Sequence, residues 1–246
     1  MLCYFISDLH LDPKHEKTVT VFHNFMTQLC DEKPNSLFIL GDFFEYWIGD
    51  DGLNEWSRSI QSRILELSSS GTRVYFMAGN RDFLLGETFC KNAGMCLLKE
   101  PTLLQLCNQP VLLMHGDTLC TNDVQYQKFR QHVRSMEWQQ DFLQRPISER
   151  IAIAKQYREM SAKHTGNLEE NIMDVDSSMV EKTFQDYRIE KIIHGHTHRP
   201  DRHPIHSPYL SYKENCERIV LGDWHDKPSY LRVENDNFYL VTGRDI

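Results

Sequence analysis

The stretch Leu37-Phe38-Ile39-Leu40-Gly41-Asp42 decides the fold, because four apolar residues run directly into a glycine and an aspartate. A continuous apolar run of this length predicts a strand that is covered on both faces, and Gly-Asp is a turn at its end. Four further polar motifs also follow apolar runs: Asp8-Leu9-His10, Gly79-Asn80-Arg81-Asp82, His115-Gly116-Asp117 and Gly195-His196-Thr197-His198. The sequence therefore predicts five buried strands, each ending in a polar loop.

The segments between these strands predict an α/β fold. The apolar runs occupy 2–6, 37–40, 74–78, 111–114 and 189–193. Apolar residues recur at helical spacing over 21–29 and 56–67, so helices separate the first three strands, which should pair in parallel. Residues 101–114 predict a hairpin around Asn108-Gln109-Pro110, and 218–242 predicts two or three short strands with a turn at Asp236-Asn237. We therefore expect a layered, mixed sheet.

The strand signal stops between the fourth and fifth motifs. Apolar residues then recur at helical spacing: Tyr126, Phe129 and Val133, then Ile147, Ile151, Ala154 and Met160, then Met179, Val180, Phe184 and Tyr187. We interpret 121–186 as a helical insert in a core made of 1–120 and 187–246. Within the insert, 121–163 holds eight basic and five acidic residues, a balance of +3 against −8 for the whole chain.

Composition excludes several classes of protein. The charge of −8 and the pI near 5.8 argue against general nucleic-acid binding, which usually requires a basic surface. Seven cysteines without a Cys-x-x-Cys pair fit buried thiols in a reducing cytosol. The chain opens straight into an apolar strand without the marks of a signal peptide, and no 18-residue apolar run follows. We expect a cytoplasmic protein.

The five motifs together offer metal ligands. In an open α/β sheet the loops after the strands converge on one crevice. The seven ligand-type residues of these loops are Asp8, His10, Asp42, Asn80, His115, His196 and His198, more than one ion needs. We expect Asp8, His10, Asp42 and His198 to hold one ion and Asp42, Asn80, His115 and His196 the other, with Asp42 bridging. Mixed oxygen and nitrogen ligands fit two Mn²⁺, with Zn²⁺, Fe²⁺ or Co²⁺ as alternatives.

Two cations with open positions indicate phosphoester hydrolysis. The chain contains no Gly-x-Ser-x-Gly, Walker, Gly-x-Gly-x-x-Gly or His-Glu-x-x-His motif that would indicate another chemistry. The blocks resemble the calcineurin-like metallophosphoesterases, whose fold is a mixed β-sandwich flanked by helices. Arg81 stands where that family usually has a histidine that helps protonate the leaving group. Arginine does not donate a proton but grips phosphate oxygens, which favours a pyrophosphate substrate, whose phosphate leaving group has a pKa of about 6.

The longer blocks around these motifs are similar to one family, the UDP-2,3-diacylglucosamine pyrophosphatases of the lipid A pathway. The resemblance implies Mn²⁺-dependent hydrolysis of UDP-2,3-diacylglucosamine to UMP and lipid X, by attack of metal-activated water at the UMP-side phosphorus. The helical insert would be the lid that holds the acyl chains, and its basic flanks would favour an anionic bilayer. The expected location is peripheral, on the cytoplasmic face of the bacterial inner membrane, without an obligate protein partner.

The resemblance also assigns residues. It implies Arg81, Asp42 and Asn80 as catalytic residues, and Asn80, Arg81, Asp123, Ser161 and His196 as substrate contacts. Two later lid contacts of the family, an asparagine and a lysine, align with Thr165 and Leu168, which do not match; Asn167 is a candidate substitute. Trp47 and Phe83 could line the groove or pack in the core.

Two other functions stay open at the level of sequence. One is a pyrophosphatase of the same fold that acts on a soluble nucleotide sugar or CDP-alcohol. The other is a non-catalytic scaffold, which usually would have lost metal ligands.

Overall fold

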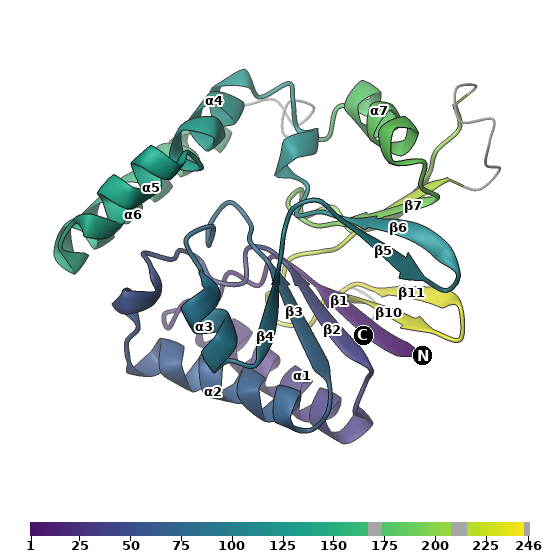
Figure 1. Ribbon diagram of the computed structural model, residues 1–246, viewed down its shortest axis with the longest axis horizontal. Helices are drawn as coiled ribbons and strands as arrows, with labels where there is room; N and C mark the ends of the chain where they lie inside the picture. Colours follow the sequence, from purple (N-terminus) through teal and green to yellow (C-terminus); the bar gives the residue numbers. More distant parts are fainter. Residues whose placement is uncertain (167–173, 208–215, 244–246) are drawn as a thin grey trace.

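Two β-sheets lie face to face between layers of helices in the computed structural model, which describes residues 1–166, 174–207 and 216–243 (Figure 1). The six-stranded sheet has the order β11 (Asn237–Val241), β10 (Tyr230–Glu234), β1 (Leu2–Ile6), β2 (Ser36–Leu40), β3 (Arg73–Met77) and β4 (Met95–Leu98). Its strands β1 to β4 are parallel, as the sequence predicts for the first three. The pairs β1–β10 and β10–β11 are antiparallel.

The second sheet has five strands. Their order is β5 (Thr102–Leu106), β6 (Gln109–Leu113), β7 (Lys191–His194), β9 (Glu217–Val220) and β8 (Asp201–Pro204). Strands β6, β7 and β9 are parallel, whereas β5 and β8 run antiparallel at the edges. Both sheets are mixed and pack face to face, which confirms the mixed β-sandwich that the family resemblance implies, whereas the apolar pattern alone predicted a single layered sheet.

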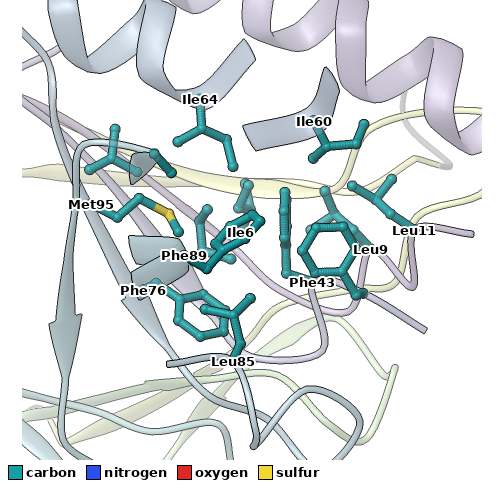
Figure 2. Close-up of a cluster of buried hydrophobic side chains, with 14 of the residues drawn as sticks. Ile6, Leu9, Leu11, Phe43, Ile60, Ile64, Phe76, Leu85, Phe89 and Met95 are labelled. Atoms are coloured by element: carbon teal, nitrogen blue, oxygen red, sulfur yellow. The ribbon is translucent and has the colours of Figure 1, made fainter. Parts of the chain in front are cut away.

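Helices α1 (Glu16–Glu32), α2 (Glu55–Ser69) and α3 (Glu87–Asn92) cover the outer face of the six-stranded sheet. Helix α2 begins with a capping box, in which the side chain of Asn54 accepts a hydrogen bond from the Ser57 N–H at 2.9 Å. Its residues Ile60 and Ile64 are fully buried and point toward the strands (Figure 2). Burial of each such side chain contributes about 1.5–3 kcal/mol, so this layer fixes the strands beneath it.

The strands alternate their side chains between two cores. In β1, Tyr4 and Ile6 face the helices, while Phe5 faces the second sheet. The ring of Phe5 stacks on Phe38 with centroids 4.7 Å apart. Because both faces of β1 are buried, its sequence is continuously apolar, as predicted for a covered strand.

The remaining helices differ in their surroundings. Helix α7 (Ser177–Tyr187) packs through Val180 and Phe184 on the outer face of the five-stranded sheet, against Leu112 and Ile192. Helices α4 (Val124–Val133), α5 (Met136–Gln144) and α6 (Ile147–Thr165) form a separate group beyond the ends of the strands (Figure 1). All four lie in the stretch for which the sequence predicts helices. Within the described part of the chain, no helix combines the length and apolar character that crossing a bilayer requires.

Several local elements differ from the sequence prediction. The strand predicted at 189–193 is β7, at Lys191–His194, and the last hairpin turns at Asn235 and Asp236, both with positive φ, rather than at Asp236-Asn237. The strands β4 and β8 and the short helix α3 have no counterpart in the prediction. The described residues also form two short 3₁₀ turns, at Asp50–Gly52 and Asp117–Leu119.

Candidate metal centre

The five polar motifs meet at one edge of the sandwich. Each follows the carboxyl end of β1, β2, β3, β6 or β7, and the loops after these strands come together below α4–α6 (Figure 1). The backbone of the first two loops is joined by hydrogen bonds from the Asp8 N–H to the Gly41 carbonyl and from the His10 N–H to the Asp42 carbonyl, at 3.1 and 3.0 Å. The seven ligand-type side chains therefore share one region.

Asp8, His10 and His198 converge at one point. The Nε2 atoms of His10 and His198 are 3.2 Å apart, and Nε2 of His198 is 3.4 Å from Oδ1 of Asp8. Oδ2 of Asp42 lies 3.9 Å from Nε2 of His10. These four residues are those expected for the first ion.

The other carboxylate oxygen of Asp42 faces a second group. Oδ1 of Asp42 is 3.7 Å from Nε2 of His115. Oδ1 of Asn80 is 2.8 Å from the same nitrogen and 2.9 Å from Nδ1 of His196. Asp42 thus presents one oxygen to each group, as a bridging ligand would.

The spacing of these donor atoms fits divalent cations. Metal–ligand bonds of about 2.0–2.2 Å place neighbouring donors roughly 2.8–3.6 Å apart, and only the two distances to Asp42 exceed this range, by a few tenths of an ångström. Oδ1 of Asp8 is buried and accepts no hydrogen bond from any described residue, whereas Oδ2 accepts from Ser7 Oγ and the His196 N–H. The donor set therefore fits a pair of cations.

The backbone of the centre is strained. Asp8, His10, Asp42, His196 and His198 all have φ between 48° and 69°, in the left-handed region. Such conformations cost non-glycine residues free energy and gather at functional sites. Five of the seven predicted ligands share this feature, so the loops are bent specifically to turn these side chains inward.

A backbone carbonyl orients one histidine ring of the centre, and carboxylates lie behind two others. Nδ1 of His115 lies 2.9 Å from the Leu40 carbonyl, so the Nδ1–H donates there and Nε2 is the nitrogen that faces the position of a cation. Nδ1 of His10 is 3.1 Å from Glu45, and Nδ1 of His198 is 3.4 Å from Asp223. Neither Glu45 nor Asp223 is predicted as a functional residue from the sequence. Gly222-Asp223 follows β9 as Gly41-Asp42 follows β2, a signal that could have indicated Asp223.

Electrostatics favours positive charge at this centre. Burial alone would lower the pKa of His115, but the carboxylates of Asp42 and Asp8 raise it to about 9. Burial also opposes protonation of His198, whereas Asp8 raises its pKa to about 10. In contrast, burial and the charge of His115 lower the pKa of His196 to about 4. In the metal-free protein, His115 and His198 thus hold protons at the positions where cations would bind.

Asp82 braces two of the loops. It is fully buried and accepts hydrogen bonds from the N–H groups of Phe43 at 2.7 Å and Gly79 at 2.8 Å. Burial and the nearby Asp42 carboxylate raise its pKa to about 6. Asp82 belongs to the motif Gly79-Asn80-Arg81-Asp82, but the sequence alone does not show whether it binds a metal or accepts backbone hydrogen bonds.

A cavity of about 280 Å³ opens beside the centre, below α4–α6; we call it the apolar groove. Its polar end holds Glu45, Asn80 and Arg81, with Arg158, Ser161 and His164 on the lid side; its other walls include Trp47, Phe83, Leu84, Phe129, Trp138, Phe142, Ala154, Tyr157 and Met160. Trp47 and Phe83 thus line the groove. The guanidinium of Arg81 bonds to no described side chain, and its buried Nε has no partner.

Three of the predicted substrate contacts line this groove and two do not. Asn80, Arg81 and Ser161 line it. His196 stands at the metal centre, 2.9 Å from Asn80. Asp123 caps α4 and pairs with His164 at 2.9 Å, so it reaches the groove through His164. Asn167 and Leu168 lie outside the described residues, as does the side chain of Thr165.

Comparisons with known proteins show which sequences and folds this chain resembles. The sequence profile of the calcineurin-like phosphoesterases matches residues 1–200. A UDP-2,3-diacylglucosamine hydrolase of Hahella chejuensis is 45% identical over 239 residues, covering 96% of this chain and 95% of that protein. The protein of the same name from Stenotrophomonas maltophilia is 41% identical over 249 residues, covering 98% of both. A dimetal phosphatase from Danio rerio shares the fold alone, with a TM-score of 0.52 and 12% identity over 98% of this chain and 95% of that one.

Proposed function

Since the chain belongs to the calcineurin-like phosphoesterases, and among them to the UDP-2,3-diacylglucosamine hydrolases, we propose that it hydrolyses UDP-2,3-diacylglucosamine to UMP and 2,3-diacylglucosamine 1-phosphate in lipid A synthesis. The continuity of the apolar groove with the metal centre carries this proposal. Asn80 and Arg81 offer a polar end to a pyrophosphate, and the aromatic walls suit acyl chains. A nucleotide sugar without acyl chains would leave these walls in contact with water, at a cost of about 25 cal/mol per Å².

Two cations are the proposed cofactors. Asp8, His10 and His198 would hold one, Asn80, His115 and His196 the other, with Asp42 between them. When bound, the pair supplies an activated water and positive charge beside the phosphoryl oxygens. The mixture of carboxylate, amide and imidazole donors fits Mn²⁺, and none of the seven proposed donors is a thiolate that would select a softer ion.

Arg81 is the proposed phosphate clamp. Its main-chain N–H donates to Oδ1 of Asp42 at 2.8 Å, which fixes the residue beside the proposed bridging carboxylate. Its guanidinium, which forms no hydrogen bond with a described side chain, can donate two parallel hydrogen bonds to a phosphoryl group. The oxygen of a water molecule would bond to the UMP-side phosphorus and release a proton to solvent. The bond from this phosphorus to the bridging oxygen would break, and its electron pair would stay on the 1-phosphate. That leaving group needs no proton, so arginine suffices where an alkoxide would require an acid.

The helices α4–α6 are the proposed lid over the acyl chains, a narrower unit than 121–186 because α7 packs on the second sheet. Phe83 of the core lies 6.0 Å from Trp138 of α5, and Trp138 stacks on Phe142 at 4.7 Å. These rings can close around methylenes, each of which contributes about 0.8 kcal/mol on burial. Ser161 and His164, with Asp123 behind, would bind the sugar.

The lid is also the proposed membrane-facing surface. Half of the large exposed apolar side chains that the structure describes belong to it: Val124, Phe129, Met136, Leu143, Ile147, Ile151 and Met160. The +3 charge of 121–163 adds attraction to anionic headgroups. We expect Met136→Asp to weaken sedimentation with anionic vesicles, with Leu65→Asp on α2 as the matched control; equal loss in both variants would argue against this surface.

A product assay tests the whole proposal. Protein incubated with Mn²⁺ and UDP-2,3-diacylglucosamine should release UMP, and both EDTA and Asp42→Ala should stop the release. A panel that includes UDP-N-acetylglucosamine and a CDP-alcohol should show preference for the acylated substrate. Equal turnover of unacylated compounds would favour the soluble-substrate function instead, and no turnover of any compound would favour a scaffold.

A further inference from the structure

We propose that a second cleft, which borders the metal centre at His10 and His198, binds the nucleotide end of the substrate. This inference rests on the proposed function. The cleft has a volume of about 660 Å³, within the range of small-molecule sites, roughly 300–1,000 Å³. Buried Leu9 and Trp224 lie beneath it, and Lys14, His15 and His225 form its rim. We call it the nucleotide cleft.

The nucleotide cleft and the apolar groove adjoin each other at the metal centre. Glu45 and Arg81 line both cavities, so the two meet at the phosphate clamp. The apolar groove includes Asn80 of the second ligand group, whereas the nucleotide cleft includes His10 and His198 of the first. A pyrophosphate that lies across both groups must direct one substituent into each cavity. The acylated sugar and the nucleoside are these substituents.

The residues that line the two cavities indicate which one holds the acylated sugar and which one holds the nucleoside. The apolar groove is mostly aromatic and aliphatic and suits acyl chains. The rim of the nucleotide cleft is charged and polar, which suits ribose hydroxyls and uracil carbonyls. Nothing comparable to the aromatic walls of the groove surrounds it among the described residues.

Unpaired donors in the cleft indicate a ligand. Lys14 is exposed and its ammonium pairs with no described residue, whereas its neighbour Lys17 pairs with Asp226 at 3.3 Å. Trp224 lines the cleft, and its indole N–H is buried without a hydrogen-bond partner in the described part of the chain. A buried donor left unpaired costs about 1–3 kcal/mol, so a ligand that satisfies it would bind favourably.

The start of α1 adds further donors. The first N–H groups of a helix have no partner within it, and the side chain of His15, at the N-cap, makes no capping hydrogen bond. Glu16, Lys17 and Thr18 of this first turn line the cleft. Their N–H groups can donate to oxygens of a nucleotide.

The test separates the two cavities by product inhibition. We expect Lys14→Glu to raise the KM for substrate and the inhibition constant of UMP about tenfold, equivalent to about 1.4 kcal/mol. Its kcat, its cation content and its inhibition by 2,3-diacylglucosamine 1-phosphate should stay within about twofold of wild type. Phe83→Ala, in the apolar groove, should show the reverse pattern, with weaker inhibition by the lipid product only. Lys91→Glu on α3 is the control for charge reversal and should change neither constant.

Two outcomes overturn the inference while leaving the proposed function intact. One is turnover of the substrate with unaltered UMP inhibition in Lys14→Glu. The other is loss of UMP inhibition in Phe83→Ala instead. Calorimetric titration of UMP into Mn²⁺-loaded protein tests the cleft even without turnover: binding by wild type that Lys14→Glu weakens supports it, and absence of binding rejects it. Failure of the proposed function shows separately, as absence of UMP release from the acylated substrate.

Discussion

Gly79 sits where any larger residue would meet the carboxylate of Asp42. A Cβ at Gly79 would overlap Oδ1 and the main-chain nitrogen of Asp42. Gly79→Ala must therefore push the β2 and β3 loops apart and displace the proposed bridging ligand. We expect elemental analysis of this variant to find fewer than two cations per chain, and its product release to fall at least a hundredfold, the scale of losing a principal electrostatic stabiliser.

Gly71→Ala is the matched control for this prediction. Gly71 has a positive φ, of 109°, so an alanine there is strained, but a Cβ at Gly71 would meet no atom within 4 Å. The substitution should lower stability by about 1–2 kcal/mol through backbone strain and leave two cations in place. Two cations and full activity in Gly79→Ala would contradict the assignment of Asp42 as the bridge.

Arg81 should act on the rate without acting on the metals. Because its guanidinium forms no hydrogen bond or ion pair with a described side chain, Arg81→Ala should keep both cations and lower kcat/KM about 10²–10³-fold. Arg81→Lys should recover only part of this loss, since lysine cannot form the bidentate pair. Steady-state kinetics with parallel elemental analysis measures both effects. Full activity of the lysine variant would show that a point charge is sufficient and that the fork geometry has no role.

The metal-ligand residues could be predicted from the sequence, but the residues that contact these ligands could not. Asp42 and Asn80 are recognisable because each follows an apolar run at a strand end, where loops converge. Glu45 and Asp223 were not recognised, because a carboxylate that orients a histidine ring acquires this role only from which imidazole nitrogen faces it. Local sequence carries the first kind of information and not the second.

At the scale of elements, the strands predicted from continuous apolar runs are those buried on both faces. Two edge strands, β4 and β8, were missed for a physical reason. Strand β8, Asp201–Pro204, pairs on one side only and is built of polar residues and a proline, which protect an edge from further pairing. Strand β4 closes the other sheet, and its middle residues Cys96 and Leu97 are exposed. The sequence also could not separate α7 from α4–α6, because helical periodicity does not reveal which surface covers a helix.

Arg130 anchors the lid to the metal loops. It pairs from α4 with Asp117 at 2.7 Å and Glu100 at 3.1 Å, and Glu100 in turn accepts the His115 N–H at 2.7 Å. Asp117 is fully buried and Glu100 nearly so. Arg130→Ala leaves these carboxylates without their cation, so we expect a loss of about 3–5 kcal/mol in the free energy of unfolding, measured by urea denaturation.

Arg145 provides the comparison within the same lid. Its pair with Asp141 on α5 is solvent-exposed and spans one helical turn, so Arg145→Ala should cost less than about 1 kcal/mol. Similar losses in the two variants would mean that the buried network at Arg130 contributes no more than a surface ion pair. In that case, the lid would be held by its apolar contacts alone.

Across the whole molecule, the centre lies where two sheets bring their loops to the same end. The division into two sheets could not be predicted from residues alone, because Phe5 of one sheet and Val111 of the other are equally buried and equally apolar. Their packing against each other is what brings His115 and His196 to the loops of β1 and β2. The metal centre therefore depends on the packing of the two sheets. Cation binding at this centre should also depend on pH.

Protons and cations should compete at the centre. In metal-free protein, burial opposes the protonation of His115 and His198, but nearby carboxylates raise their pKa values to about 9 and 10, so both carry protons at pH 7. Cation binding displaces these protons. The apparent affinity for Mn²⁺ should thus rise from pH 6.5 to 8.5, which calorimetric titration in buffers of different ionisation enthalpy can measure together with the protons released.

The thermal stability of the metal-free protein should change in the opposite direction. A pKa raised in the folded state stabilises folding fully below its unfolded value, about 6.5, and this contribution is lost as pH rises through the folded value. His115 is fully buried and should dominate, while His198, with 37% of its side chain exposed, contributes less because solvent screens it. His196, whose pKa burial lowers to about 4, titrates below this window. With EDTA the melting temperature should fall from pH 6.5 to 9, and with saturating Mn²⁺ this fall should vanish or reverse; parallel curves would show that the cations do not replace the protons of His115.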